Sequence, residues 1–297
     1  MTAHSAIAAW AAVDAPATPE SYLQAARRRF MSSRVGLAAL AVLLFLVALS
    51  VCAPLLTSYD PAVGQPVDRL KAIGTPGHLL GTDEQGRDML TRILYGGRMS
   101  LIAGLAPVFV ATVIGTALGS LSGFIGRWVA AVIMRTMDMF YAFPAVLLAI
   151  AISASLGPGL FNQIIALSII YIAPIARVAE AATRRIVVAE FIEAAKLTGA
   201  PTTRIIVTQV LANIFSPIFV YASGLVGLAI VTAASLSFLG LGVRPPTPEW
   251  GFMLNSLRGT IYVNPWVAAL PGFFIFITSI SFNMLADSVR DALDVKE

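Results

Sequence analysis

Charged residues are scarce in this chain. Asp, Glu, Lys and Arg make up 12% of its 297 residues, whereas about one quarter of a typical soluble domain is charged. Hydrophobic residues make up 58%, and the mean hydropathy is +0.82. This composition excludes an ordinary soluble domain and predicts an all-α polytopic membrane protein. The net charge of +4 comes from basic residues spread over several loops, so we expect no nucleic-acid partner.

Residues for metal binding and catalysis are also scarce. Cys52 is the only cysteine, which excludes an intrachain disulfide and a cysteine metal cluster. His4 and His78 lie far apart in the sequence, so we expect no metal site. The chain has no GxxxxGK[ST] phosphate loop and no HExxH or GxSxG motif. We therefore expect no catalytic residues and no ATP bound by this chain through such a loop.

Long apolar runs are what the chain has instead. Six of them are long enough to cross a bilayer, or nearly so, and they cover residues 35–56, 101–124, 139–156, 160–177, 213–236 and 266–285. No Lys, Arg, Asp, Glu or His lies near the centre of any run. A proton-driven carrier normally needs such groups, although backbone carbonyls could still bind a sodium ion. The few Ser, Thr and Asn residues in the runs suit helix packing, or a passage lined with neutral groups.

The distribution of basic residues predicts the topology. Arg27, Arg28 and Arg29 precede the first run, and the segments on the N-terminal side of the membrane hold 13 of the 20 Lys and Arg residues. The positive-inside rule therefore places both termini in the cytoplasm. We expect a cytoplasmic tail over residues 1–33, with residues 1–19 disordered. Residues 34–297 would form the transmembrane domain, ending in a short charged tail from residue 286.

The polar segment before the second run predicts a short interfacial helix. Thr82 or Asp83 would cap it, and Gly96–Gly97 would end it. Within the second run, glycines recur every fourth residue at Gly115, Gly119 and Gly123. This smooth face predicts close helix packing, either within the chain or against a partner. Arg135 and Asp138, three residues apart, could pair on one helix.

A second polar segment, residues 178–210, separates the fourth and fifth runs. Good helix formers surround Glu193, Gly199 offers a positive-φ stop, and Pro201 cannot continue the helix. Thr202 or Thr203 could cap a second helix. The segment therefore predicts a helix, a tight turn and another helix that project into the cytoplasm.

This cytoplasmic segment carries a resemblance to a known family. Glu193-Ala194-Ala195, three further residues and Gly199 resemble the signature of ABC importer membrane subunits. The family pattern usually continues to a Leu-Pro, where this chain has Leu211-Ala212.

Four further stretches are similar to the second permease of dipeptide/oligopeptide-type importers. They are LLGTDEQGRDMLTRILYGGRMSL, MRTMDMFYAFPAVLLAI, SLSFLGLGVRPPTPEWGFML and NMLADSVRDALD, in this order from Leu79 to Asp294. Many relatives carry an acidic residue at the position of Ala233.

The resemblance implies a fold, partners and roles. The fold would be the ABC importer type I permease fold with six transmembrane helices, in a bacterial inner membrane. A second homologous permease would complete the pathway as a heterodimer. Two ATPase subunits, which hold ATP and Mg, would couple to Glu193, Ala194, Ala195 and Gly199. An extracytoplasmic binding protein would deliver the cargo. A periplasmic segment, Gly81, Thr82, Asp83, Gly86, Arg87 and Asp88, would hold local structure or contact that protein.

Several functions are compatible with the sequence. The leading one is a permease for di- or oligopeptides, and the same architecture could carry a nickel chelate, glutathione or a short glycan. A channel or ion-driven carrier that works alone is a second class. An assembly factor held together by the glycine face is a third.

Overall fold

The computed structural model describes residues 22–293, and its regular elements are helices. The longer helices are α2 (Tyr22–Ser32), α3 (Arg34–Val51), α5 (Met89–Ile125), α6 (Arg127–Tyr141), α7 (Ala145–Leu156), α8 (Leu160–Val187), α11 (Leu211–Phe238) and α13 (Pro265–Leu293). The shorter ones are α4 (Ala53–Leu56), η1 (Pro66–Asp68), α9 (Glu190–Leu197), α10 (Thr202–Ile205), η2 (Ile206–Val210), α12 (Trp250–Ser256) and η3 (Leu257–Tyr262). The segment predicted to be disordered, residues 1–19, lies outside the described residues.

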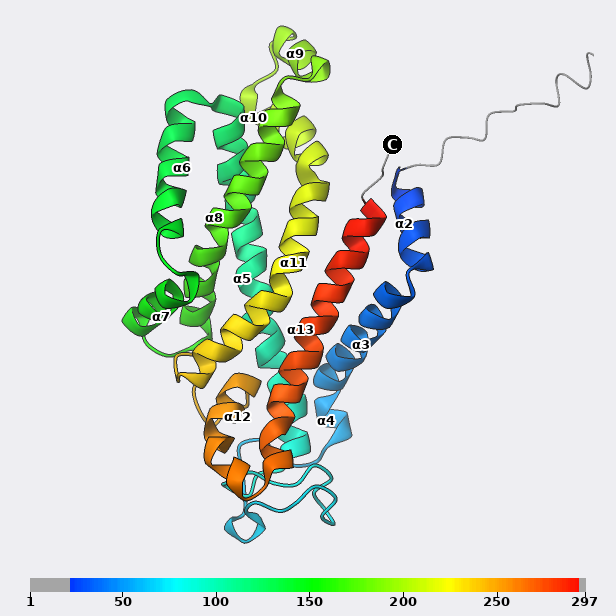
Figure 1. Cartoon of the computed structure of the whole chain (residues 1–297), viewed down its shortest axis with the longest axis vertical. Helices are drawn as coiled ribbons and strands as arrows, with labels where there is room; N and C mark the ends of the chain where they lie inside the picture. The colour runs from blue at the N-terminus through cyan, green and yellow to red at the C-terminus, as the bar shows by residue number, and fades with distance from the viewer. Residues whose placement is uncertain (1–21, 294–297) are drawn as a thin grey trace, which may run out of the picture.

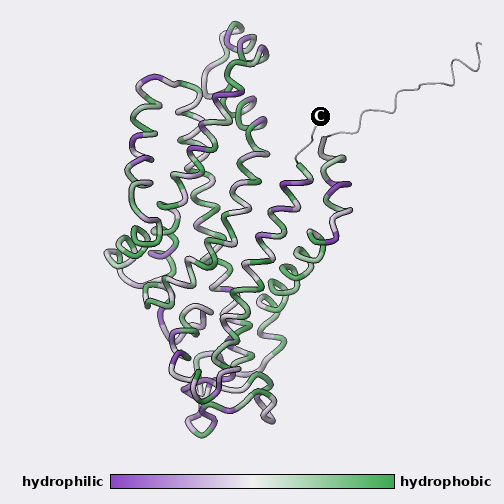
Figure 2. The backbone as a smooth tube through the Cα atoms, viewed as in Figure 1, coloured by the Kyte–Doolittle hydropathy of each residue, from purple (hydrophilic) through white to green (hydrophobic). Residues whose placement is uncertain are grey.

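Five helices in residues 22–293 are long and apolar enough to span a membrane: α3, α5, α8, the rod Thr202–Phe238 and α13. The predicted third span falls on a pair of helices, α6 and α7, which are bent by 91° and would make a sixth span if they are counted together. Large apolar side chains such as Phe109 and Phe161, 71% and 73% exposed, cover the outside of the bundle. Figure 2 shows apolar residues along the length of most helices. An exposed apolar surface of this extent fits a lipid environment.

The predicted third span, residues 139–156, is not one straight helix. The chain is helical up to Tyr141, breaks over three residues, and turns into α7 at Ala145. Pro144 is the N-cap of α7, and it lacks the N–H that a continuous helix would need. A proline also pushes the preceding residue, Phe143, out of the helical region. An apolar run alone did not reveal this break.

The predicted short interfacial helix is also wrong, because its residues form the start of α5. Asp88, rather than Thr82 or Asp83, caps the helix by accepting a hydrogen bond from the Thr91 N–H. Gly96 and Gly97 do not end it. A Cβ on Gly97 would overlap the Ser50 hydroxyl of α3 and lie 3.0 Å from the Trp250 ring. These glycines therefore allow close packing inside the helix.

Other boundaries differ by the extension of helices into the predicted loops. α8 continues to Val187, ten residues past the predicted end of the fourth span. α13 continues to Leu293, so the predicted charged tail is mostly helical. Tyr22–Ser32, in the predicted N-terminal tail, forms α2, which packs against α13. A helix does not have to end at the bilayer surface, because its backbone groups remain hydrogen-bonded to each other in water as well.

The bundle has two distinct ends (Figure 1). At one end α9 and α10 project beyond the other helices; we call this the α9 end. At the opposite, α12 end lie the irregular 57–88 segment and α12. The start of α2 and the end of α13 both lie toward the α9 end.

Candidate functional site

The α9–α10 turn, residues 190–205, has the predicted helix–turn–helix shape. α9 ends at Leu197, and Gly199 follows with a φ of +75°. An L-residue rarely adopts this left-handed conformation, which glycine reaches freely. Pro201 then serves as the N-cap of α10 without a side-chain hydrogen bond, so neither Thr202 nor Thr203 fills the predicted capping role. The chain reverses direction within a few residues, so the α9–α10 turn is a compact projection.

The α9–α10 turn is fixed to the bundle by its buried side chains. Ile192 is fully buried and belongs to the same apolar core as α5, α8 and α11. Burying such a side chain contributes about 1.5–3 kcal/mol. On the exposed side, the Lys196 ammonium lies 5.2 Å from the centre of the Phe124 ring, at the end of α5. A force applied to the turn would therefore reach α5 and α8 directly.

The exposed face of this turn is unusually apolar for a projection. Phe191 and Leu197 are 46% and 88% exposed, and Val188, just before the turn, is 76% exposed. Glu193, Ala194 and Gly199 are exposed too, whereas Ala195 is buried. Large apolar side chains on a protruding surface are typical of protein–protein contact sites. The residues of the sequence signature thus lie beside an apolar surface suited to docking.

The 57–88 segment is built around a buried ion-pair network. Asp83 lies 2.6 Å from the Arg87 guanidinium and 3.3 Å from that of Arg92, and all three side chains are nearly fully buried. The Asp83 carboxylate also accepts the N–H groups of Gln85 and Arg87. Arg92 donates to the Pro61 carbonyl at 2.7 Å. Asp83 therefore fixes this segment to the start of α5.

A second polar group lies beside it. His78 contacts Asp88 through Nδ1 at 3.0 Å and Asp68 through Nε2 at 3.7 Å. The hydrogen bond from Lys71 lowers the pKa of Asp68 below its usual value, against the opposing effect of desolvation. Thr82 donates to the Asp68 carbonyl. These contacts link residues 68–88 into one compact unit.

All six residues predicted for the periplasmic segment are buried: Gly81, Thr82, Asp83, Gly86, Arg87 and Asp88. Gly86 has a φ of +75°, and a Cβ there would overlap the Gln65 carbonyl oxygen. Their burial favours the role of holding local structure. The residues of this segment that a partner could reach are others, such as Val63 and Val67, which are 66% and 82% exposed.

The glycine face of α5 packs against α8. A Cβ on Gly119 would overlap the Ala176 carbonyl oxygen, and one on Gly123 would lie 2.7 Å from the Thr183 Cβ. A Cβ on Gly115 would lie 2.9 Å from the Ile172 carbonyl oxygen. Of the two alternatives left open by the sequence, the structure places this face within the chain rather than free for a partner.

Glu249 is a buried acidic residue that the sequence pattern did not single out. Its carboxylate caps α12 by accepting the N–H groups of Gly251 and Phe252, at 2.9 and 2.8 Å, and also accepts the Ser100 hydroxyl at 3.0 Å. The Trp250 indole donates to the Ile93 carbonyl. Burial raises the pKa of Glu249. Glu is not among the residues preferred at N-caps, so the sequence carried no signal for this cap.

The two departures from the family pattern occupy ordinary helical positions. Ala233 is buried in α11, and its carbonyl accepts a hydrogen bond from Gln163 of α8 at 2.6 Å. Ala212 is exposed near the start of α11, where η2, a five-residue π-helix, joins α10 to α11. The rod therefore runs from Thr202 to Phe238 without the break that a proline could introduce.

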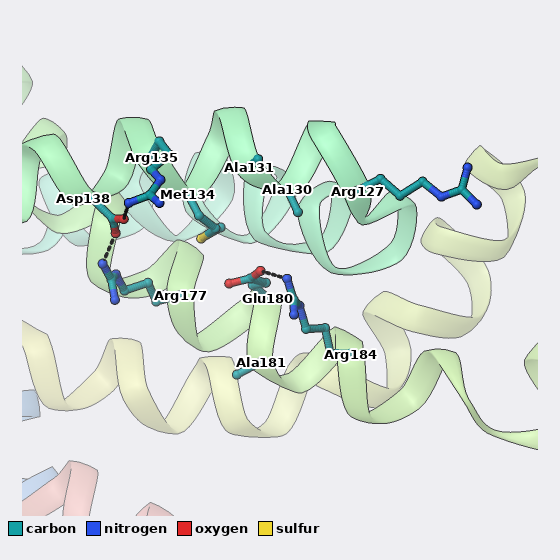
Figure 3. Close-up of a pocket in the computed structure, with 10 residues that line it drawn as sticks. All are labelled: Arg127, Ala130, Ala131, Met134, Arg135, Asp138, Arg177, Glu180, Ala181 and Arg184. Carbon is teal, nitrogen blue, oxygen red and sulfur yellow. Dashed lines mark hydrogen bonds and ion pairs between the residues drawn. The ribbon is translucent and has the colours of Figure 1, made fainter.

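A cleft of about 650 Å³ opens between α6 and α8 (Figure 3). We call it the α6–α8 cleft. Its charged lining consists of the arginines Arg127, Arg135, Arg177 and Arg184 and the acidic residues Asp138 and Glu180. Arg135 approaches Asp138 at 3.9 Å, as the sequence spacing suggested, while Arg177 makes the closer contact with Asp138.

Comparisons with known proteins give a consistent result. Residues 115–296 match the family model described as binding-protein-dependent transport system inner membrane component. Residues 21–72 match the N-terminal TM domain of oligopeptide transport permease C.

Individual relatives match over most of the chain. The glutathione transport system permease protein GsiD of Pectobacterium atrosepticum is 43% identical over 91% of this chain and 89% of its own. The dipeptide transport system permease protein DppC of Alkalihalophilus pseudofirmus is 41% identical over 91% and 88%. The di/tripeptide transport system permease protein DppC of Pseudomonas aeruginosa is 41% identical over 90% of each.

Proposed function

Because this chain belongs to the family of binding-protein-dependent transport system inner membrane components, we propose that it forms, with a second permease, the pathway of an ATP-binding-cassette importer for di- or oligopeptides. It is a multi-pass protein of the bacterial cell membrane and a transport subunit rather than an enzyme. Two relatives are named for dipeptide and di/tripeptide transport, which supports a peptide cargo. Glutathione, itself a tripeptide, is the second candidate, because another relative is named for its transport.

The proposed orientation places the α9 end in the cytoplasm. The excess of basic residues in the segments that reach this end supports it. The 57–88 segment and α12 then face the periplasm, where a substrate-binding protein would deliver the cargo. Two ATPase subunits, carrying ATP and Mg, would serve the two permeases.

The observation that carries the proposal is the α9–α10 turn. It combines the Glu193–Gly199 signature with the exposed side chains of Phe191 and Leu197 and with the buried anchor Ile192. An ATPase that moves on binding ATP could bind the apolar surface of the turn. The buried Ile192 side chain would then transmit the movement to α5 and α8. Rigid-body motion biased by a ligand on another subunit is a general switching mechanism.

The experiment is transport by a Gly199→Leu variant. Leucine at a φ of +75° costs about 1–2 kcal/mol, which is enough to distort the turn locally. We expect membrane insertion to be unchanged and ATP-dependent uptake to fall at least tenfold, measured with radiolabelled dipeptide.

Gly240→Leu is the matched control. Gly240 follows α11 with a φ of +81°, and, as at Gly199, no atom lies within 4 Å of the position that a Cβ would take. Its N–H donates to the Ser237 carbonyl as that of Gly199 donates to the Lys196 carbonyl, so leucine meets similar backbone strain at a different helix end and should leave transport normal. Wild-type uptake by the Gly199 variant would refute the docking role, and uptake by the purified chain without ATP would favour a carrier that works alone.

A further inference from the structure

The α6–α8 cleft carries more positive than negative charge. Four arginines line it against two carboxylates, an excess of two positive charges. In Figure 3, the Arg177 and Arg135 side chains converge on Asp138, and Arg184 reaches Glu180. The two acids are thus already shared among three arginines. Any further ligand in the cleft meets a net positive surface.

Two guanidiniums supply this excess. Arg127 has no ion-pair partner among the described residues, and Figure 3 shows its side chain extending away from both carboxylates. The Arg135 side chain is 85% exposed. Its guanidinium lies 3.9 Å from the Asp138 carboxylate, farther than the guanidinium of Arg177. Exposed pairs at this distance are weak. Both groups are available to bind an anion.

The surroundings of the cleft are those of a membrane surface. Trp128 follows Arg127 at the start of α6 and is 73% exposed, and exposed Trp is typical of the level of lipid headgroups. Farther along α6, Val132 and Met139 are 58% and 62% exposed. An arginine-lined cleft beside exposed apolar side chains offers one surface to a charged headgroup and another to acyl chains.

We propose that the α6–α8 cleft binds the phosphate group of an anionic phospholipid from the bilayer leaflet at the α9 end. Arginine is suited to this ligand, because its planar fork donates two parallel hydrogen bonds to phosphate oxygens. Basic pockets between membrane helices are known to take such headgroups. The cleft, at about 650 Å³, lies within the range of about 300–1,000 Å³ of sites that hold molecules of similar size. The inference depends on neither the cargo nor the orientation.

Lipid retention tests the proposal. The permease is purified with its co-purifying subunits into nanodiscs of equal phosphatidylglycerol and phosphatidylcholine, and native mass spectrometry counts the retained lipids. We expect phosphatidylglycerol to be enriched on the wild-type complex. The double variant Arg127→Gln/Arg135→Gln should lose this enrichment by about tenfold or more, since each basic group near a membrane surface contributes measurably to anionic-lipid binding.

The control Arg69→Gln/Arg258→Gln removes the same charge at the α12 end, where both side chains are exposed, and should retain the enrichment. Equal thermal unfolding of all three proteins in phosphatidylcholine alone establishes that they are folded. Undiminished enrichment in the Arg127/Arg135 variant, or an equal loss in the control, overturns the proposal. Displacement of the lipid by millimolar inorganic phosphate assigns the cleft to a soluble anion instead. Enrichment only after the other subunits are stripped off shows that a protein surface covers it.

Discussion

Asp83 compensates two buried positive charges at once. The side chains of Arg87 and Arg92 are 3% and 1% exposed, and Asp83 is within 3.3 Å of both. Asp83→Ala would leave these guanidiniums without their shared carboxylate. Breaking a buried ion pair from one side typically costs about 3–5 kcal/mol. We expect a loss of this size in the free energy of unfolding, measured by denaturant titration in detergent.

Asp60, in the same 57–88 segment, provides the comparison for Asp83. It is exposed and accepts one hydrogen bond, from the Ala62 N–H, so Asp60→Ala should cost only about 1 kcal/mol. Equal destabilisation by the two substitutions would show that the ion-pair network is not what holds the segment.

Glu249 predicts a pH dependence of stability. Burial raises the pKa of Glu249 in the folded protein. At pH values between the pKa of this residue in the unfolded state and its pKa in the folded state, the native state therefore holds a proton that the unfolded state has lost. Stability should therefore fall as the pH rises from about 4.5, the ordinary value, through the folded pKa. Asp68, whose pKa is lowered, contributes a change of the opposite sign, and only below about 3.8.

Glu249→Gln removes this titration. The melting temperature of the variant should stay flat across the interval in which that of the wild type falls, because glutamine keeps a hydrogen-bond acceptor for α12 but cannot ionise. A wild-type melting temperature that rises with pH over this interval would contradict the assignment of the shift to Glu249.

At the scale of elements, the contact between α5 and α8 depends on the absence of side chains at three positions. Gly119→Ala would place a methyl group on the Ala176 carbonyl oxygen. Both helix backbones would have to shift, at a cost of about 1–3 kcal/mol. We expect a lower melting temperature of the purified protein, by several degrees.

Gly224→Ala in α11 is the matched substitution. A Cβ there meets no atom within 4 Å, so the better helix propensity of alanine should leave stability unchanged or raise it by up to about 1 kcal/mol. If Gly119→Ala proved as harmless as Gly224→Ala, the close approach of α5 and α8 would not be a stability determinant.

The elements also show what a sequence pattern can and cannot predict. Apolar runs located the membrane helices, because hydrocarbon requires about 20 such residues in a row. They did not locate helix ends, since helices continue through water with their own hydrogen bonds, as α8 and α13 do. Gly96–Gly97 was misinterpreted as a stop because a glycine required by packing looks the same in sequence as one required by a turn. At Gly199 and Pro201 two independent signals agreed, and the turn was predicted correctly.

At the scale of the whole molecule, sites formed by distant residues were beyond prediction. The α6–α8 cleft joins residues 39 to 57 positions apart, and no periodicity relates them. The exposure of Leu197 could not be predicted from the sequence either, because an apolar residue in an amphipathic helix is usually buried. The Glu193–Gly199 signature could be recognised in the sequence because it lies within one short segment.

The central claim is that ATPase subunits dock on the α9–α10 turn from the cytoplasm, and a single labelling measurement tests it. In a Cys52→Ser background, Leu197→Cys places the only thiol at a position that is 88% exposed. A membrane-impermeant maleimide is applied to right-side-out and inverted vesicles, with and without the ATPase subunits. We predict labelling in inverted vesicles only, and protection when the ATPases are bound. Labelling from the outer side, or equal labelling with and without the ATPases, would contradict the account.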